Sequence, residues 1–228
     1  MKRKLSQLIA TLACIALGVA ISQLTLANTI VYNLDYEFSG GSAPAGTAPW
    51  VVVTISDIGS GSVKLTLSNQ GLIDNEFTSE VNLNVARDYI GKLAFQQDND
   101  SQLGSFALPT IGQSEDRYKP DGDGRFDIQF AFETAKDKRF GAGESVTYIV
   151  TSTDPGLDAT DFNLTSTPGG GAGTYHAAAH IQGIGEDSSL SGWIGDSRSP
   201  GVVPDGGNTT TLLGCAMLGL GFLARRKT

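Results

Sequence analysis

The sequence contains little cysteine, and the long segment between its two ends contains none. Cys14 and Cys215 both lie in apolar stretches near the termini. A domain without thiols cannot rely on disulfides, so its stability depends on a hydrophobic core. The chain of 228 residues is long enough to form one, because a domain of ~150 residues buries ~70% of the surface of its unfolded chain.

Positive charge is also scarce in the middle of the chain. Six of the 16 Lys and Arg residues stand near the ends, so residues 28–203 hold ten, against 23 Asp and Glu. The net charge of this segment is therefore about −13, which repels phosphate backbones and predicts no nucleic-acid partner. Common catalytic patterns are missing too: the chain has no G-x-S-x-G and no H-E-x-x-H. We therefore expect no enzyme.

Glycine is abundant, with 29 residues, and the hydrophobic pattern has a period of two. The alternation predicts strands over 30–38, 50–58, 62–68, 77–85, 126–132, 145–152 and 175–184. Only Asp158–Asn163 indicates a short helical turn. Short strands separated by Gly, Pro and Asp clusters predict an all-β fold, an antiparallel β-sandwich or a jelly roll.

The first residues have the pattern of a secretory signal peptide. Three basic residues precede an apolar run from about Leu8 to Leu26, and small residues stand before a cleavage point between Ala27 and Asn28. Such a leader directs export and is then removed. The alternative is a retained transmembrane anchor, because the apolar run is rather long.

The C-terminal end combines a polar turn, a short apolar stretch and a basic cluster. Val203-Pro204-Asp205-Gly206-Gly207 precedes residues 209–224, which are uncharged, and Arg225-Arg226-Lys227 then follows. A helix of that length spans ~24 Å, against ~30 Å of hydrocarbon core. The basic cluster would stop transfer and keep the C-terminus cytoplasmic.

This tail resembles the PEP-CTERM sorting signal of exopolysaccharide-associated proteins, in the variant that usually reads Val-Pro-Asp-Ser-Gly. Gly206 stands where that variant has Ser. The resemblance implies recognition and cutting by an exosortase, a membrane protease or transpeptidase of Gram-negative envelopes. An ordinary C-terminal tail anchor is the alternative. The middle of the chain also resembles uncharacterised proteins that carry this tail, at 120–127, 179–184 and 191–195.

A cluster of carboxylates lies in the Gly-rich stretch before the strand predicted at 126–132. Asp121, Asp123 and Asp127 could converge on Ca²⁺, which takes 6–8 oxygen ligands. The alternative is a hairpin turn in which Asp and Gly supply left-handed backbone.

His176 and His180, four apart, could share a face, but no third metal ligand is apparent. Trp50 and Trp193 could stack on sugars or pack in the core.

These observations divide the chain into a signal peptide at 1–27, an exported β-sandwich at 28–197, a linker with the sorting motif at 198–208, and a short transmembrane helix with a basic tail at 209–228. We expect an exported envelope, surface or extracellular-matrix protein with a structural or adhesive role, anchored briefly in the inner membrane. Its expected partners are an exosortase and exopolysaccharide. The alternatives are a Ca²⁺- or carbohydrate-binding module and, less favoured, a glycoside hydrolase.

Overall fold

A computed structural model of the chain describes residues 27–59, 61–98, 102–171, 173–196 and 201–204. Within these residues the protein is all-β, as the sequence predicts, and every strand pairing is antiparallel. The twelve strands of this part are β1 (Asn28–Glu37), β2 (Val51–Gly59), β3 (Ser62–Ser68), β4 (Phe77–Leu83), β5 (Leu93–Gln97), β6 (Thr110–Tyr118), β7 (Phe126–Ala131), β8 (Phe140–Gly141), β9 (Ser145–Ser152), β10 (Ala177–Ile184), β11 (Leu190–Asp196) and β12 (Gly201–Pro204).

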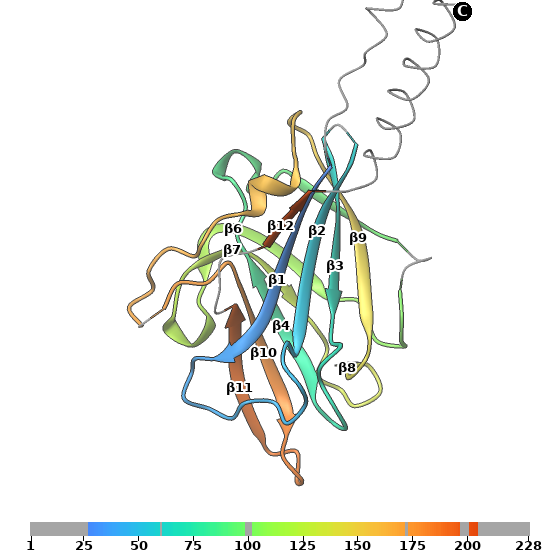
Figure 1. The fold of residues 1–228 in the computed structure, drawn as a ribbon, viewed down its shortest axis with the longest axis vertical. Coiled ribbons are helices and arrows are strands. Elements are labelled where there is room, and N and C mark those ends of the chain that lie inside the picture. The colour runs from blue at the N-terminus through green and yellow to red at the C-terminus, as the bar shows by residue number, and fades with distance from the viewer. Residues whose placement is uncertain (1–26, 60, 99–101, 172, 197–200, 205–228) are drawn as a thin grey trace, which may run out of the picture.

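All twelve strands belong to one sheet, in the order β5-β9-β3-β2-β1-β11-β10-β4-β7-β6, with β12 added to β1 and β8 to β4. The sheet curls so that its two ends approach each other. Figure 1 shows β1, β2, β3 and β9 side by side, with β6 and β7 crossing behind them. Side chains from the two ends of the sheet order contact each other: the ring centroid of Phe95 on β5 lies 5.5 Å from that of Phe130 on β7.

The alternation that predicts the strands also fills the core. In β3, Val63, Leu65 and Leu67 are buried with 0% exposed surface, while the residues between them are half-buried. β2 shows the same pattern in Val51, Val53 and Ile55. Successive side chains of a strand point to opposite faces, so one face of the curled sheet forms the core and the other faces outward.

In the part of the chain that the structure describes, three short 3-10 helices connect the strands: η1 (Arg87–Tyr89), η3 (Pro120–Gly122) and η4 (Ala159–Phe162). The helical turn predicted at 158–163 is η4. Asp158 is its N-cap, and Asp158 and Asp161 form a capping box that satisfies exposed backbone N–H groups at the start of the turn.

The structure describes only part of the two ends of the chain. Residues 201–204, expected as part of a linker, form β12, which pairs with the start of β1 through Asn28↔Pro204 and Thr29↔Val203. The signal helix before Ala27 and the transmembrane helix at 209–228 lie outside the described residues. Among the helices that are described, none is long and apolar enough to cross a membrane.

Candidate functional site

The three aspartates predicted as a calcium site do not come together. Asp121 lies exposed in η3 with a left-handed φ of 45°. Asp127 turns instead toward backbone: its Oδ1 accepts the N–H of Asp116 at 2.9 Å and its Oδ2 accepts that of Val85 at 3.4 Å. No group of three or more His, Cys, Asp or Glu in the described part of the chain could hold a metal ion. The segment forms a turn with left-handed backbone at Asp121, as the alternative predicts, and calcium binding by these three residues stays a prediction.

Asp123 is buried and contacts the glycine-rich loop that precedes β10. A Cβ added to Gly171 would lie 1.2 Å from Asp123 Oδ1, and that oxygen has no hydrogen-bond partner. Burial, with a smaller contribution from the charge of Asp123, raises the pKa of Tyr175 to about 12. The Tyr175 ring stacks on Phe38 with centroids 4.4 Å apart. Together these residues cover part of the outer face of the sheet.

The rest of the outer face carries a row of polar and aromatic side chains. His180 on β10 pairs with Trp193 on β11 and with Glu80 on β4, so strand register places the three side by side. The rings of His180 and Trp193 stack with centroids 4.6 Å apart and an interplanar angle of 14°. We call this surface the outer polar face; its residues are Ser79, Glu80, Gln129, His180, Gln182 and Trp193.

Hydrogen bonds hold the outer polar face in a fixed arrangement. Ser79 Oγ lies 3.0 Å from His180 Nδ1, and Gln182 Nε2 donates to the same Ser79 oxygen at 3.2 Å. On the other side, Gln129 Nε2 donates to Glu80 Oε2 at 2.8 Å. Burial lowers the pKa of His180, although the charge of Asp121 opposes this. The imidazole is therefore held neutral at pH 7, where it can donate one hydrogen bond and accept another.

A buried amide lies beside this row. Asn82 on β4 stands between Ala178 on β10 and Gln129 on β7, and its exposed fraction is 0%. Both atoms of its amide lack a hydrogen-bond partner at ordinary distance. Burial raises the pKa of Glu80, while Gln129 and the nearby Asn82 lower it. Aromatic faces combined with amide and carboxylate groups are suited to polar ligands with apolar patches, such as sugars.

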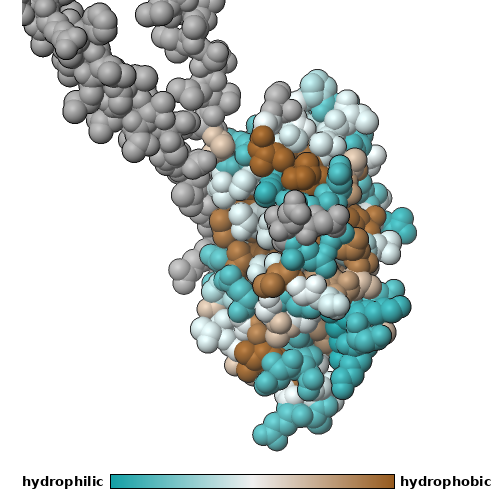
Figure 2. Space-filling view, turned by 90° about the vertical axis from the view of Figure 1, so that its right-hand side faces the viewer, coloured by the Kyte–Doolittle hydropathy of each residue, from teal (hydrophilic) through white to brown (hydrophobic). Residues whose placement is uncertain are grey.

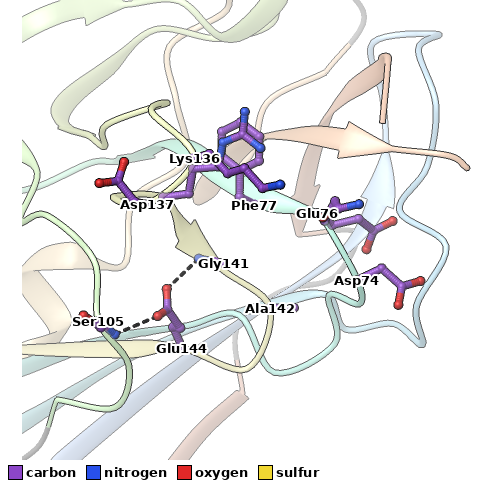
Figure 3. A pocket seen from close by; sticks show the side chains of 11 residues that line it. Asp74, Glu76, Phe77, Ser105, Lys136, Asp137, Gly141, Ala142 and Glu144 are labelled. Carbon is purple, nitrogen blue, oxygen red and sulfur yellow. Dashed lines mark hydrogen bonds between the residues drawn. The ribbon is translucent and has the colours of Figure 1, made fainter. Parts of the chain in front are cut away.

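A separate cavity of about 310 Å³ lies between the loops around 74–77 and 136–144 (Figure 3). Glu144 at its wall accepts the N–H of Gly141 at 2.7 Å and that of Ser105 at 2.8 Å. The Arg139 guanidinium lies over the Phe77 ring, 4.1 Å from its centroid. Glu144 and Arg139 thus connect neighbouring loops, and the cavity is a gap between these loops.

The predicted histidine pair is also divided between two sites. His176, just before β10, bonds through Nδ1 to Asp196 Oδ2 at 2.7 Å and stacks on Tyr32. His180 contacts Ser79 and Trp193 instead. Of the two tryptophans, Trp50 is only 9% exposed and belongs to the core, while Trp193 is half-buried on the outer polar face. Of the two tryptophans, only Trp193 therefore remains available for stacking on a sugar.

Among the described residues, the large exposed apolar side chains are spread over strands and loops: Tyr36, Ile58, Ile73, Leu103, Leu108, Leu164 and Leu190. Figure 2 shows one face, on which apolar groups alternate with hydrophilic ones.

Of the predicted sorting motif, Val203 and Pro204 belong to β12. Asp205, Gly206, Gly207, Arg225, Arg226 and Lys227 lie outside the described residues.

No known protein family, curated protein or solved structure matches this chain.

Proposed function

We propose that the protein is an exported component of the cell envelope or extracellular matrix, with a structural or adhesive role. One observation carries the proposal. The first strand begins at Asn28 and the last strand ends at Pro204, and these two residues pair with each other in the sheet. The predicted leader and the predicted sorting tail therefore flank the twelve paired strands of the described residues.

This arrangement suits a protein that is cut at both ends. Cleavage between Ala27 and Asn28 would remove no residue of β1, and cleavage after Pro204 would remove no residue of β12. The sheet would retain its hydrogen bonds and its core in the processed form. The proposed partner at the second cut is an exosortase, and the membrane holds the chain only until that cut.

Two finer features belong to the same proposal. We interpret the curled sheet as a β-sandwich or jelly roll, flanked before processing by a signal helix and a short transmembrane helix. We also propose a binding or structural role and not catalysis. The strongly acidic body, at about −13, would disfavour nucleic acids and anionic surfaces.

Intact-mass measurement of the protein from its native host tests the proposal. Termini at Asn28 and close to Pro204 would support both processing steps. A host strain lacking its exosortase should accumulate a longer species that keeps the C-terminal basic cluster. If the mass shows that the tail persists in the wild-type host, the sorting proposal fails and a plain tail anchor replaces it.

A second function, carbohydrate binding, is favoured by the outer polar face. The stacked His180 and Trp193 rings lie beside Glu80 and Gln182, and the buried amide of Asn82 lies on the same side of β4 as Glu80. Sugars are commonly bound by an aromatic face with flanking amide and carboxylate groups. Retention of the protein on purified host exopolysaccharide should fall in Trp193→Ala but not in Tyr89→Ala. Equal retention of both variants would exclude this face as the binding site.

A further inference from the structure

The first residue of β1 has an acidic partner. The backbone N–H of Asn28 donates to Asp57 Oδ2, with 2.8 Å between nitrogen and oxygen. Asp57 is half-buried near the end of β2. Its other oxygen, Oδ1, accepts the N–H of Ala159 at the start of η4 at 2.7 Å. Both oxygens of this carboxylate are therefore fixed in place, and one of them points at the Asn28 nitrogen.

The surroundings of Asp57 carry an excess of negative charge. Asp158 and Asp161 of the η4 capping box lie close by, and burial raises the pKa of Asp161, with the charges of Asp158 and Asp57 adding to the effect. The neighbouring cation on β3, Lys64, pairs with Asp98 at 3.5 Å. Among the described residues, no ion pair includes Asp57, Asp158 or Asp161. In the part of the chain that the structure describes, these three carboxylates therefore have no cationic side chain within ion-pair distance.

We propose that Asp57 is the binding site for the α-ammonium group that signal cleavage creates at Asn28. The inference rests on the proposed cleavage after Ala27. Hydrolysis breaks the Ala27–Asn28 amide bond, adds the hydroxyl of water to the Ala27 carbonyl carbon, and leaves an amine on Asn28 that takes up a proton. The same nitrogen that donates one hydrogen bond in the precursor then carries a positive charge, 2.8 Å from a carboxylate oxygen.

Removal of the leader would in this way place a positive charge beside the Asp57 carboxylate. A charged donor makes a shorter and stronger hydrogen bond than a neutral amide. The carboxylates of Asp57, Asp158 and Asp161 all favour the protonated amine, so its pKa should rise above the ordinary ~7.7–8.0 of an α-amino group. Because the folded pKa exceeds the unfolded one, the stabilisation is complete below about pH 7.7 and is lost as the pH rises through the folded value.

The experiment uses the full gene, expressed in an exporting Gram-negative host, and the mature protein purified from it. Mass spectrometry first establishes that Asn28 is the N-terminus. Trace acetylation with acetic anhydride at a series of pH values, read on the N-terminal peptide, then gives the pKa of the α-amino group. The variant is Asp57→Asn, which keeps an oxygen for the Ala159 N–H. The control is Asp187→Asn, in the exposed β10–β11 turn at the opposite end of the sheet (Figure 1).

We expect a raised α-amino pKa in the wild type and in Asp187→Asn, and a fall of about one unit in Asp57→Asn. The melting temperature of the wild type should drop by about 3 to 5 °C between pH 7.5 and 9.5 for each unit of pKa elevation, and that of Asp57→Asn should drop less. An α-amino pKa within the ordinary range in the wild type would overturn the inference while leaving the processing proposal intact. That measurement does not depend on whether Asp57→Asn folds. An N-terminus other than Asn28 would overturn both.

Discussion

The side-chain amide of Gln113 hydrogen-bonds both backbone groups of Leu93. Gln113 Nε2 donates to the Leu93 carbonyl oxygen at 2.9 Å, and the Leu93 N–H donates to Gln113 Oε1 at 3.3 Å. Gln113 lies on β6 and Leu93 on β5, the two ends of the sheet order. A side chain therefore takes the place of a strand at the point where the curled sheet closes, and it satisfies backbone groups that an edge strand otherwise leaves unpaired.

The first prediction follows from this contact. Gln113→Leu keeps the size of the side chain but leaves the N–H and C=O of Leu93 without their partner. We expect a loss of about 1 to 3 kcal/mol in the free energy of unfolding, measured by chemical denaturation, with faster hydrogen exchange at the Leu93 amide. Gln96→Leu, at an exposed position of β5, is the matched control. Equal losses in both variants would show that the Gln113 contact does not hold the sheet ends together.

The alternation of apolar and polar residues in the sequence predicts those strands that bury one face in the core. The hairpin expected at 50–58 and 62–68 is observed as β2 and β3, at 51–59 and 62–68, because one face of each strand enters the core. β6 carries no comparable pattern: Thr110–Tyr118 has no fully buried residue. A strand at the end of the sheet order can be polar on both faces, so hydrophobic periodicity does not identify it. The sequence pattern also does not identify β5, which has only five residues, or β11, in which Gly192 and Gly195 interrupt the alternation.

The candidate site is harder still to predict, because it is assembled across strands. Glu80 and His180 are one hundred residues apart, and only the pairing of β4 with β10 makes them neighbours. Trp193 is visible in the sequence as a rare residue, but its stacking partner is not. Asp121 and Asp127 show the opposite case, in which residues close in sequence have different surroundings. Asp121 lies in the η3 turn, whereas the Asp127 carboxylate accepts hydrogen bonds from the N–H groups of Asp116 and Val85.

A second prediction concerns the close approach of backbone at Gly71. A Cβ at this position would lie 2.3 Å from the Pro49 carbonyl oxygen and 2.4 Å from that of Thr47. Backbone atoms cannot rotate away as a side-chain tip can, so Gly71→Ala must displace the segment before β2. We expect a loss of about 2 to 4 kcal/mol in the free energy of unfolding. Gly143→Ala, which has left-handed φ but nothing within 4 Å, should cost only the ~1–3 kcal/mol of backbone strain.

The third prediction is a pH dependence at the outer polar face. Burial lowers the pKa of His180, with the charge of Asp121 raising it. The folded value lies below the unfolded one, so the neutral imidazole contributes stability above about pH 6.5, and this is lost as the pH falls through the folded pKa. An NMR titration should place the His180 midpoint below 6.5, and Asp121→Asn should lower it further. A midpoint at or above 6.5 would contradict the buried, stacked environment described for this ring.

The last prediction concerns calcium. Asp127 is committed to the N–H groups of Asp116 and Val85, so Asp121 and Asp123 lack the third carboxylate that the sequence pattern assigns to them. A ligand that binds only the folded state raises its stability, by about 2.7 kcal/mol at a concentration of a hundred times its Kd. We therefore expect no change in the melting temperature when about 10 mM CaCl₂ is added, which is roughly ten to a hundred times the Kd of weak extracellular calcium modules, or when a chelator removes the ion. A calcium-dependent rise that is abolished by Asp121→Asn would restore the calcium site. Asp187→Asn, in the exposed turn between β10 and β11, should leave any such rise unchanged.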